Sequence, residues 1–194
     1  MGAAFKRVAC IASKIAKNIG IISRISYLLP VNVRLTLYYS LVFPYLAYCN
    51  MIWASNYNHR LTRIKVLQTR IIRIIAGLPY NSHTDPLFSY FGFLKLSQIK
   101  HKQINEFMHR YVFNTLPTVY PNFFTVASDI HSYNTRNRSS IRNAFARTNS
   151  RKFSISVVGP ATWNNLPQDL RVISNFNLFK KKLHLWLIMN AETN

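Results

Sequence analysis

The side chains most able to do chemistry in this sequence are its bases. Lys and Arg number 25 against five Asp and Glu, so the 194-residue chain carries a formal net charge of +20. Eleven of the bases fall within the first 84 residues, where no acid occurs. This excess of positive charge repels itself and calls for a polyanion as partner. The composition therefore indicates nucleic acid first, and an anionic membrane surface second.

Carboxylates, which metal-dependent enzymes need in pairs, occur one at a time. The closest two, Asp85 and Glu106, are 21 positions apart, whereas metal-assisted phosphoryl transfer needs at least two around its ions. The His and Cys residues lack zinc-binding spacings, and the five Gly form no phosphate-binding loop. We predict no catalytic residue and no metal site, so that the chain binds rather than catalyses. An enzyme that assembles carboxylates from distant positions is the alternative.

Two predicted helices carry their bases on the side opposite an apolar stripe. Over residues 8–24 the apolar side chains are Val8, Ile11, Ile15, Ile19 and Ile22. A second helix of this kind covers 58–76 and ends at Gly77. With no acid nearby, i,i+4 pairing cannot neutralise the bases. We therefore predict that the backbone of a nucleic-acid duplex contacts Lys14, Lys17, Arg63, Lys65, Arg70 and Arg73. Simple solvation or binding to a membrane surface are the alternatives.

Between these helices, residues 35–59 carry no charge and are long enough to span a bilayer. Pro44 and five Tyr spread through the run argue against a span, because Tyr belongs at membrane interfaces. We predict a buried helix from about Asn32 through Tyr48 or Trp53, bent at Pro44. A membrane anchor over 35–59 is the alternative. Cys10 and Cys49 are expected to be small buried hydrophobes.

The second half of the chain predicts shorter helices around a basic segment. Asp85 is expected to cap a helix over 85–91, and Ser97 a longer one that ends before Pro117. A polar stretch at 128–152 holds bases that we expect to contact a strand or template RNA, namely Arg136, Arg138, Arg142, Arg147 and Arg151. A solvated linker is the alternative there. Residues 153–158 alternate like a short strand, and a final helix begins at a cap formed by residues 174–175.

Several strings, in this order, resemble the region after the palm in jockey-like, LINE-type retrotransposon reverse transcriptases. They cover nearly all of residues 8–188. The strings are KIAKNIGII at 14–22, LYYSLVFPYLAYCNMIW at 37–53, Leu67-Gln68 with Arg70 and Arg73, HTDPLF at 83–88, HSYNTR at 131–136, SISVVGPATWNNLP at 154–167 and FKKKL at 179–183. The palm motif of the family and the cysteine–histidine knuckle of some members are absent.

The resemblance implies a thumb, the helical bundle that grips the template–primer behind a polymerase active site, with a C-terminal extension. Its partners would be RNA, an RNA–DNA hybrid, and the fingers and palm of a parent polymerase that uses Mg²⁺ and deoxynucleotide triphosphates. It also implies a nuclear or cytoplasmic ribonucleoprotein. The opening Met1-Gly2-Ala3 suggests a truncated element copy or a gene-model fragment, and a remnant without function is a further alternative.

The expected fold class is mainly α, with at most a short strand pair. We expect a thumb-like helical bundle over 1–80, a helical connector over 81–127, a basic polar loop over 128–152 and a C-terminal lobe over 153–194.

Overall fold

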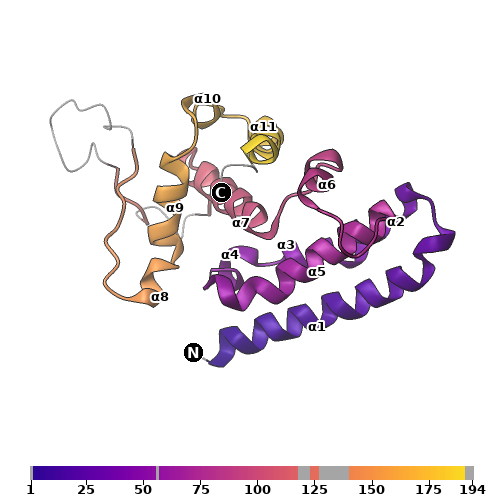
Figure 1. Ribbon diagram of the computed structural model, residues 1–194. Helices are drawn as coiled ribbons and strands as arrows, with labels where there is room; N and C mark the ends of the chain where they lie inside the picture. Colours follow the sequence, from indigo (N-terminus) through magenta and orange to yellow (C-terminus); the bar gives the residue numbers. More distant parts are fainter. Residues whose placement is uncertain (1, 56, 118–122, 127–139, 191–194) are drawn as a thin grey trace. The chain divides into compact units, whose positions relative to one another are not determined.

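The structure is a computed structural model of the chain, and it describes residues 2–55, 57–117, 123–126 and 140–190 (Figure 1). It confirms the mainly helical fold: helices dominate the described residues, which contain no sheet. One isolated antiparallel bridge joins Val126 to Ile141. The chain divides into two compact units, the first formed by Met1–Lys100 and Leu187–Asn194, the second by His101–Trp186.

The first unit is built around two long helices, α1 (Gly2–Ile25) and α5 (Asn58–Ala76), which run side by side in Figure 1. The apolar stripes predicted for both helices are buried except at Ile11 and Ile74, which are half-buried. Fully or almost fully buried side chains are Val8, Ile15, Ile19 and Ile22 of α1, and Leu61, Ile64, Ile71, Ile72 and Ile75 of α5. Each such Ile contributes about 1.5–3 kcal/mol relative to an exposed one. This shared core fixes which sides of α1 and α5 can face solvent.

Gly77 ends α5 as predicted. It is the C-cap residue and adopts the left-handed conformation, with a φ of 68°. Its N–H and that of Leu78 bond to the last carbonyls of the helix. Glycine suits this position because a side chain there is strained.

The single bent helix predicted around Pro44 is wrong. The structure instead has α2 (Val31–Leu41), α3 (Phe43–Ala47) and α4 (Asn50–Trp53), preceded by a 3-10 turn, η1 (Ser26–Leu28). Pro44 is the second residue of α3. Proline is tolerated there because N–H groups in the first turn of a helix have no partner within the helix. Cys49 then takes the left-handed conformation, with a φ of 51°, and turns the chain into α4. Proline and this turn break the segment where we expected a bend.

Two predicted caps are also wrong. Thr84, and not Asp85, is the residue before α6 (Asp85–Tyr90), and the Asp85 carboxylate pairs with Lys95 Nζ at 2.7 Å. Ser97 lies inside α7 (Leu96–Val112). The free N–H groups at the start of α7 bond to glutamine side chains: Lys95 N donates to Gln98 Oε1 at 2.8 Å, and Leu96 N to Gln68 Oε1 at 3.0 Å. At the start of α7, Gln98 of the first turn and the distant Gln68 thus take the place of the expected Ser97 cap.

The second unit packs the rest of α7 with α8 (Asn149–Lys152), α9 (Ile155–Asn164), α10 (Gln168–Arg171) and most of α11 (Phe176–Met189). Its core holds Ile104, Met108, Trp163, Phe179 and Leu183. The predicted cap of α11 is confirmed at Asn175, whose Oδ1 accepts a hydrogen bond from Leu178 N at 3.1 Å.

The strand predicted over 153–158 is wrong, because α9 begins there. The Ser154 side chain accepts from Ser156 N and caps the helix. Gly159 packs closely on α7: a Cβ added at Gly159 would lie 2.7 Å from Met108 Sδ. A capped start and a tight helix contact therefore outweigh a six-residue alternation of Ser and apolar side chains.

Candidate nucleic-acid interface

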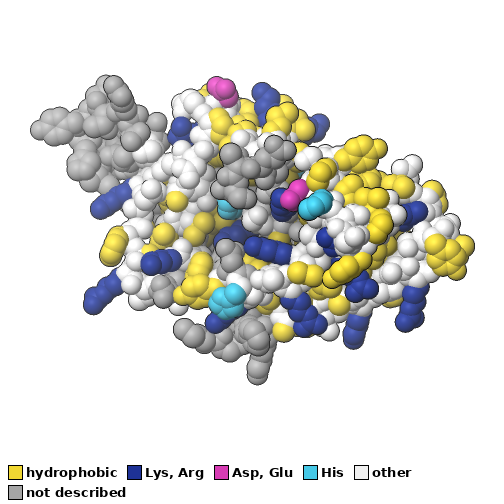
Figure 2. All heavy atoms as spheres, in the orientation of Figure 1, with side chains coloured by type: hydrophobic (Ala, Val, Ile, Leu, Met, Phe, Trp, Pro, Cys, Tyr) yellow, Lys and Arg dark blue, Asp and Glu magenta, His cyan; other side chains and the backbone are white. Residues whose placement is uncertain are grey.

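The predicted bases of α1 and α5 lie mostly on exposed sides of these helices. Lys14 and Lys17 are exposed on α1, one turn apart. Arg63 and Arg70 are exposed on α5, two turns apart and therefore on one side of the helix. In Figure 2 the Lys and Arg side chains stand singly, with uncharged surface between them. Exposed bases of this kind can contact the phosphates of a nucleic-acid backbone.

Arg73 and Lys65 are held differently from the other predicted bases. Arg73 is half-buried: its Nε donates to the carbonyl oxygen of Ser82 at 2.8 Å, and its guanidinium lies 5.7 Å from the centre of the Tyr80 ring. Lys65 is half-buried too. Arg73 therefore fastens the segment after α5 to the helix, and only part of its guanidinium is left for a partner.

Almost nothing within residues 1–100 neutralises these bases. Asp85 is the sole acid in that stretch of sequence, and it already pairs with Lys95. Lys14 Nζ lies 5.9 Å from the centre of the Tyr45 ring, a contact that leaves its charge intact. The exposed Lys14, Lys17, Arg63 and Arg70 therefore have no unpaired acid within residues 1–100 to neutralise their charge.

The basic stretch of the second unit is described only in part. Arg136 and Arg138 lie outside the described residues. Arg142, Arg147 and Arg151 are exposed, and the Arg142 N–H donates to the carbonyl oxygen of Thr125 at 2.9 Å. Arg151 belongs to α8, which Thr148 caps. These three side chains can reach solvent, but the structure gives no common face for all five.

Burial shifts the pKa of several charged groups near the middle of α7. It lowers the pKa of Lys100 and of Lys102, and raises that of Glu106, whose neighbours Lys102 and Lys180 oppose the rise. Burial disfavours the charged form of Lys100 and Lys102, so these two half-buried lysines are weaker candidates for phosphate contact than the exposed bases.

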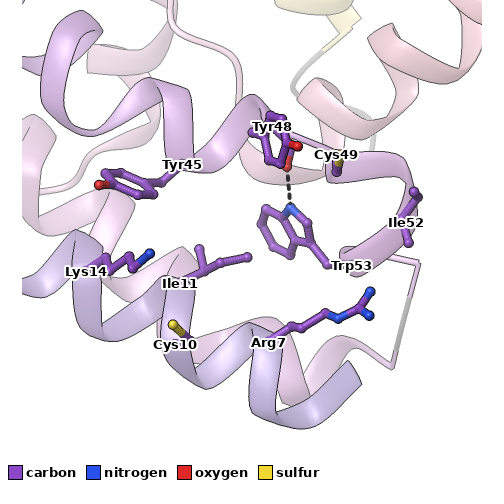
Figure 3. Close-up of a pocket in the computed structure, with 9 residues that line it drawn as sticks. All are labelled: Arg7, Cys10, Ile11, Lys14, Tyr45, Tyr48, Cys49, Ile52 and Trp53. Carbon is purple, nitrogen blue, oxygen red and sulfur yellow. Dashed lines mark hydrogen bonds between the residues drawn. The ribbon is translucent and has the colours of Figure 1, made fainter. Parts of the chain in front are cut away.

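An open groove in the first unit was not foreseen from the sequence (Figure 3). It lies between α1 and the α3–α4 segment and has a volume of about 490 Å³. Aromatic and apolar side chains dominate its lining, with two bases from α1. The lining residues are Arg7, Cys10, Ile11, Lys14, Tyr45, Tyr48, Cys49, Ile52 and Trp53. Sequence patterns could not find it, because its two walls are 31 or more positions apart in the chain.

The groove also overturns the expectation for the cysteines. Cys10 and Cys49 are both exposed free thiols, and both line the groove. Cys10 lies outside the buried stripe of α1, and Cys49 occupies the left-handed turn before α4. Position on the helix, and not residue type, decides their exposure.

Arg34 is a further base with a role that the sequence did not reveal. Its Nη1 donates to the carbonyl oxygens of Ile74 and Ile75 at 3.1 and 3.0 Å, and its Nε to that of Leu29 at 2.8 Å. The guanidinium thus satisfies carbonyls at the end of α5, where positive charge also suits the helix dipole. We assign Arg34 to the fold rather than to the interface.

Among the described residues, no three His, Cys, Asp or Glu side chains come together as metal ligands. In the same part of the chain, no helix combines the length with the hydropathy that crossing a membrane requires. Comparison of the chain with family models, with curated proteins and with solved structures finds no match.

Proposed function

We propose that this chain is a non-catalytic nucleic-acid-binding protein that holds a template–primer by its phosphate backbone. The supporting observation is the set of exposed bases on α1 and α5 in a stretch whose one acid already has a partner. Backbone binding of this kind depends on charge and shape rather than on base sequence.

The more specific part of the proposal is that the chain derives from the thumb and post-palm region of a LINE-type, RNA-directed DNA polymerase. The ordered sequence strings support this origin, and a helical first unit is compatible with it. In this proposal a palm domain carries out the polymerase chemistry, and this chain binds the RNA–DNA hybrid.

Salt dependence tests the binding. If about eight of the predicted bases contact phosphates, the plot of log K against log salt concentration has a slope of about −6 to −7. We would titrate the full chain with a labelled RNA–DNA hybrid by fluorescence anisotropy at several salt concentrations. A flat response would contradict phosphate binding.

A pair of charge-matched variants tests the location. Arg63→Gln with Arg70→Gln removes two exposed bases of α5, whereas Lys180→Gln with Lys182→Gln removes two exposed bases of α11. We expect the first pair to reduce the slope by about 2 and the second to change it little. Equal effects would show that net charge, and not the α5 face, carries the binding.

A further inference from the structure

The groove between α1 and the α3–α4 segment combines aromatic surface with positive charge. Two tyrosines and Trp53 supply aromatic surface, and Arg7 and Lys14 supply positive charge. In Figure 3 both bases extend from α1 toward α3 and α4, with Ile11 between them. The volume of about 490 Å³ falls within the range of small-molecule sites.

The spacing of the two bases favours a polymer over a single small anion. Arg7 and Lys14 are seven residues apart on α1, which places them about 10 Å apart along the helix axis. A fatty acid offers only one negative group for the two bases. A nucleic-acid strand presents successive phosphates, and its unpaired bases stack on aromatic rings.

The aromatic wall is available for such stacking. The Tyr48 side chain is 78% exposed, while its backbone carbonyl oxygen accepts the Trp53 Nε1 hydrogen bond at 2.8 Å (Figure 3). That bond holds Trp53 in place without using the Tyr48 ring. Tyr45 contributes a second ring, close to Lys14. The left-handed backbone of Cys49 lies directly after Tyr48, and such strained residues gather at ligand sites.

We propose that this groove binds an unpaired nucleotide of the bound nucleic acid. Its nucleobase would stack on Tyr45 and Tyr48, and the flanking phosphates would contact Arg7 and Lys14. The proposal rests on the proposed function and adds to it a preference for substrates that carry a single-stranded extension. A fully paired hybrid contacts the exposed lysines and arginines of α1 and α5 but leaves the groove empty.

Matched tyrosine variants test the stacking. Tyr48→Ala removes a ring that lines the groove. Tyr27→Ala is the control, because Tyr27 of η1 is similarly exposed, at 79%, but does not line the groove. The full chain is titrated with a blunt RNA–DNA hybrid and with the same hybrid carrying six unpaired nucleotides. We expect Tyr48→Ala to weaken binding of the extended hybrid about tenfold, and Tyr27→Ala to leave it unchanged. Equal affinities of the unaltered protein for the two hybrids would overturn the proposal.

The cysteines provide a second readout that does not depend on affinity. In a Cys10→Ser protein, Cys49 is the one remaining thiol of the sequence, and it lines the groove. We expect saturating extended hybrid to slow alkylation of Cys49 by iodoacetamide at least fivefold, and the blunt hybrid to leave the rate unchanged.

The outcomes separate the two proposals. Tight, salt-dependent binding of both hybrids without protection of Cys49 would overturn the groove assignment and leave the proposed function standing. Protection of Cys49 by oleate but not by the extended hybrid would assign the groove to a lipid and overturn the nucleotide proposal. Failure of both hybrids to bind would overturn the proposed function and the groove assignment together.

Discussion

The Nη1 atom of Arg34 donates a hydrogen bond to the carbonyl oxygen of Ile75 at 3.0 Å, so that a base in α2 completes the C-terminal turn of α5. The same nitrogen bonds to Ile74, and Nε bonds to Leu29. One guanidinium thereby joins α5 to the connection between α1 and α2. In a chain so rich in arginine, this residue acts within the fold rather than on a partner.

Replacing Arg34 by Met is expected to lower the free energy of unfolding by about 1–3 kcal/mol, because carbonyls at the end of α5 lose a charged donor. Arg34→Lys should recover only part of the loss, since an ammonium lacks the planar fork. Urea denaturation measures both. Arg24→Met, at an exposed position of α1, is the control, and an equal loss there would contradict a specific role for Arg34.

Two glycine substitutions should change stability in opposite directions. Gly77→Ala is expected to cost about 1 kcal/mol, because its φ of 68° strains a side chain and the new Cβ would lie 3.4 Å from Arg34 Nη1. Gly20→Ala should stabilise by about 0.5–1 kcal/mol, since it lies inside α1 with nothing within 4 Å of the new Cβ. Thermal unfolding of the two variants checks the signs, and a stabilising Gly77→Ala would refute the left-handed turn.

Gln68 is expected to be among the most sensitive polar positions of the first unit. It is 2% exposed, donates to the Leu94 carbonyl oxygen at 2.8 Å and accepts from Leu96 N. Gln68→Leu leaves both backbone groups without a partner and should cost about 2–4 kcal/mol. Thr69→Ala, which removes only a local bond to Val66, should cost less than about 0.5 kcal/mol. Similar losses in urea denaturation would contradict the assigned role of Gln68.

Acid should destabilise the second unit through His109. Its Nε2 bonds to the Ile173 carbonyl oxygen at 2.7 Å, its ring stacks on Phe179, and Arg110 is adjacent in α7. Burial lowers the pKa of His109, so the unfolded chain binds a proton that the folded chain resists. The free energy of unfolding should therefore fall as pH drops below about 6.5, by at most about 1.4 kcal/mol per pH unit.

The measurement is urea denaturation between pH 5.5 and 8, with His109→Phe for comparison. We expect the variant to lose most of the pH slope, whatever its absolute stability. Burial raises the pKa of Glu106 above its ordinary value, so protonation of that group as pH falls has the opposite effect and favours the folded chain. An unchanged slope in His109→Phe would assign the acid sensitivity to another group.

The parts of the fold that were predictable follow from local patterns. Apolar stripes with Ile at helical spacing predicted α1 and α5, which bury them. Gly77 predicted the end of α5, and Asn175 predicted the start of α11. The wrong caps of α6 and α7 arose where other side chains compete with the expected capping residues. Lys95 takes the carboxylate of Asp85 that was expected to cap α6, and Gln68 supplies an acceptor at the start of α7. Sequence spacing contains no information on such partners.

The candidate interface was predictable in the same uneven way. Exposure of Lys14, Lys17, Arg63 and Arg70 follows from the helical period. The bond of Arg73 to Ser82 does not, because it depends on how the chain turns after Gly77. The groove depends on packing between α1 and α3–α4, and the sequence gives no signal for it.

Gln98 Nε2 donates to the carbonyl oxygen of Leu187, 89 positions later, and both residues belong to the first unit. In topological terms, residues 101–186 form an insertion within a discontinuous domain. A fragment that stops at Lys100 therefore lacks the returning end of α11 and leaves the Gln98 amide without its acceptor. Cleavage of the chain within the insertion would therefore leave the two segments of the first unit on separate pieces, joined by noncovalent contacts alone.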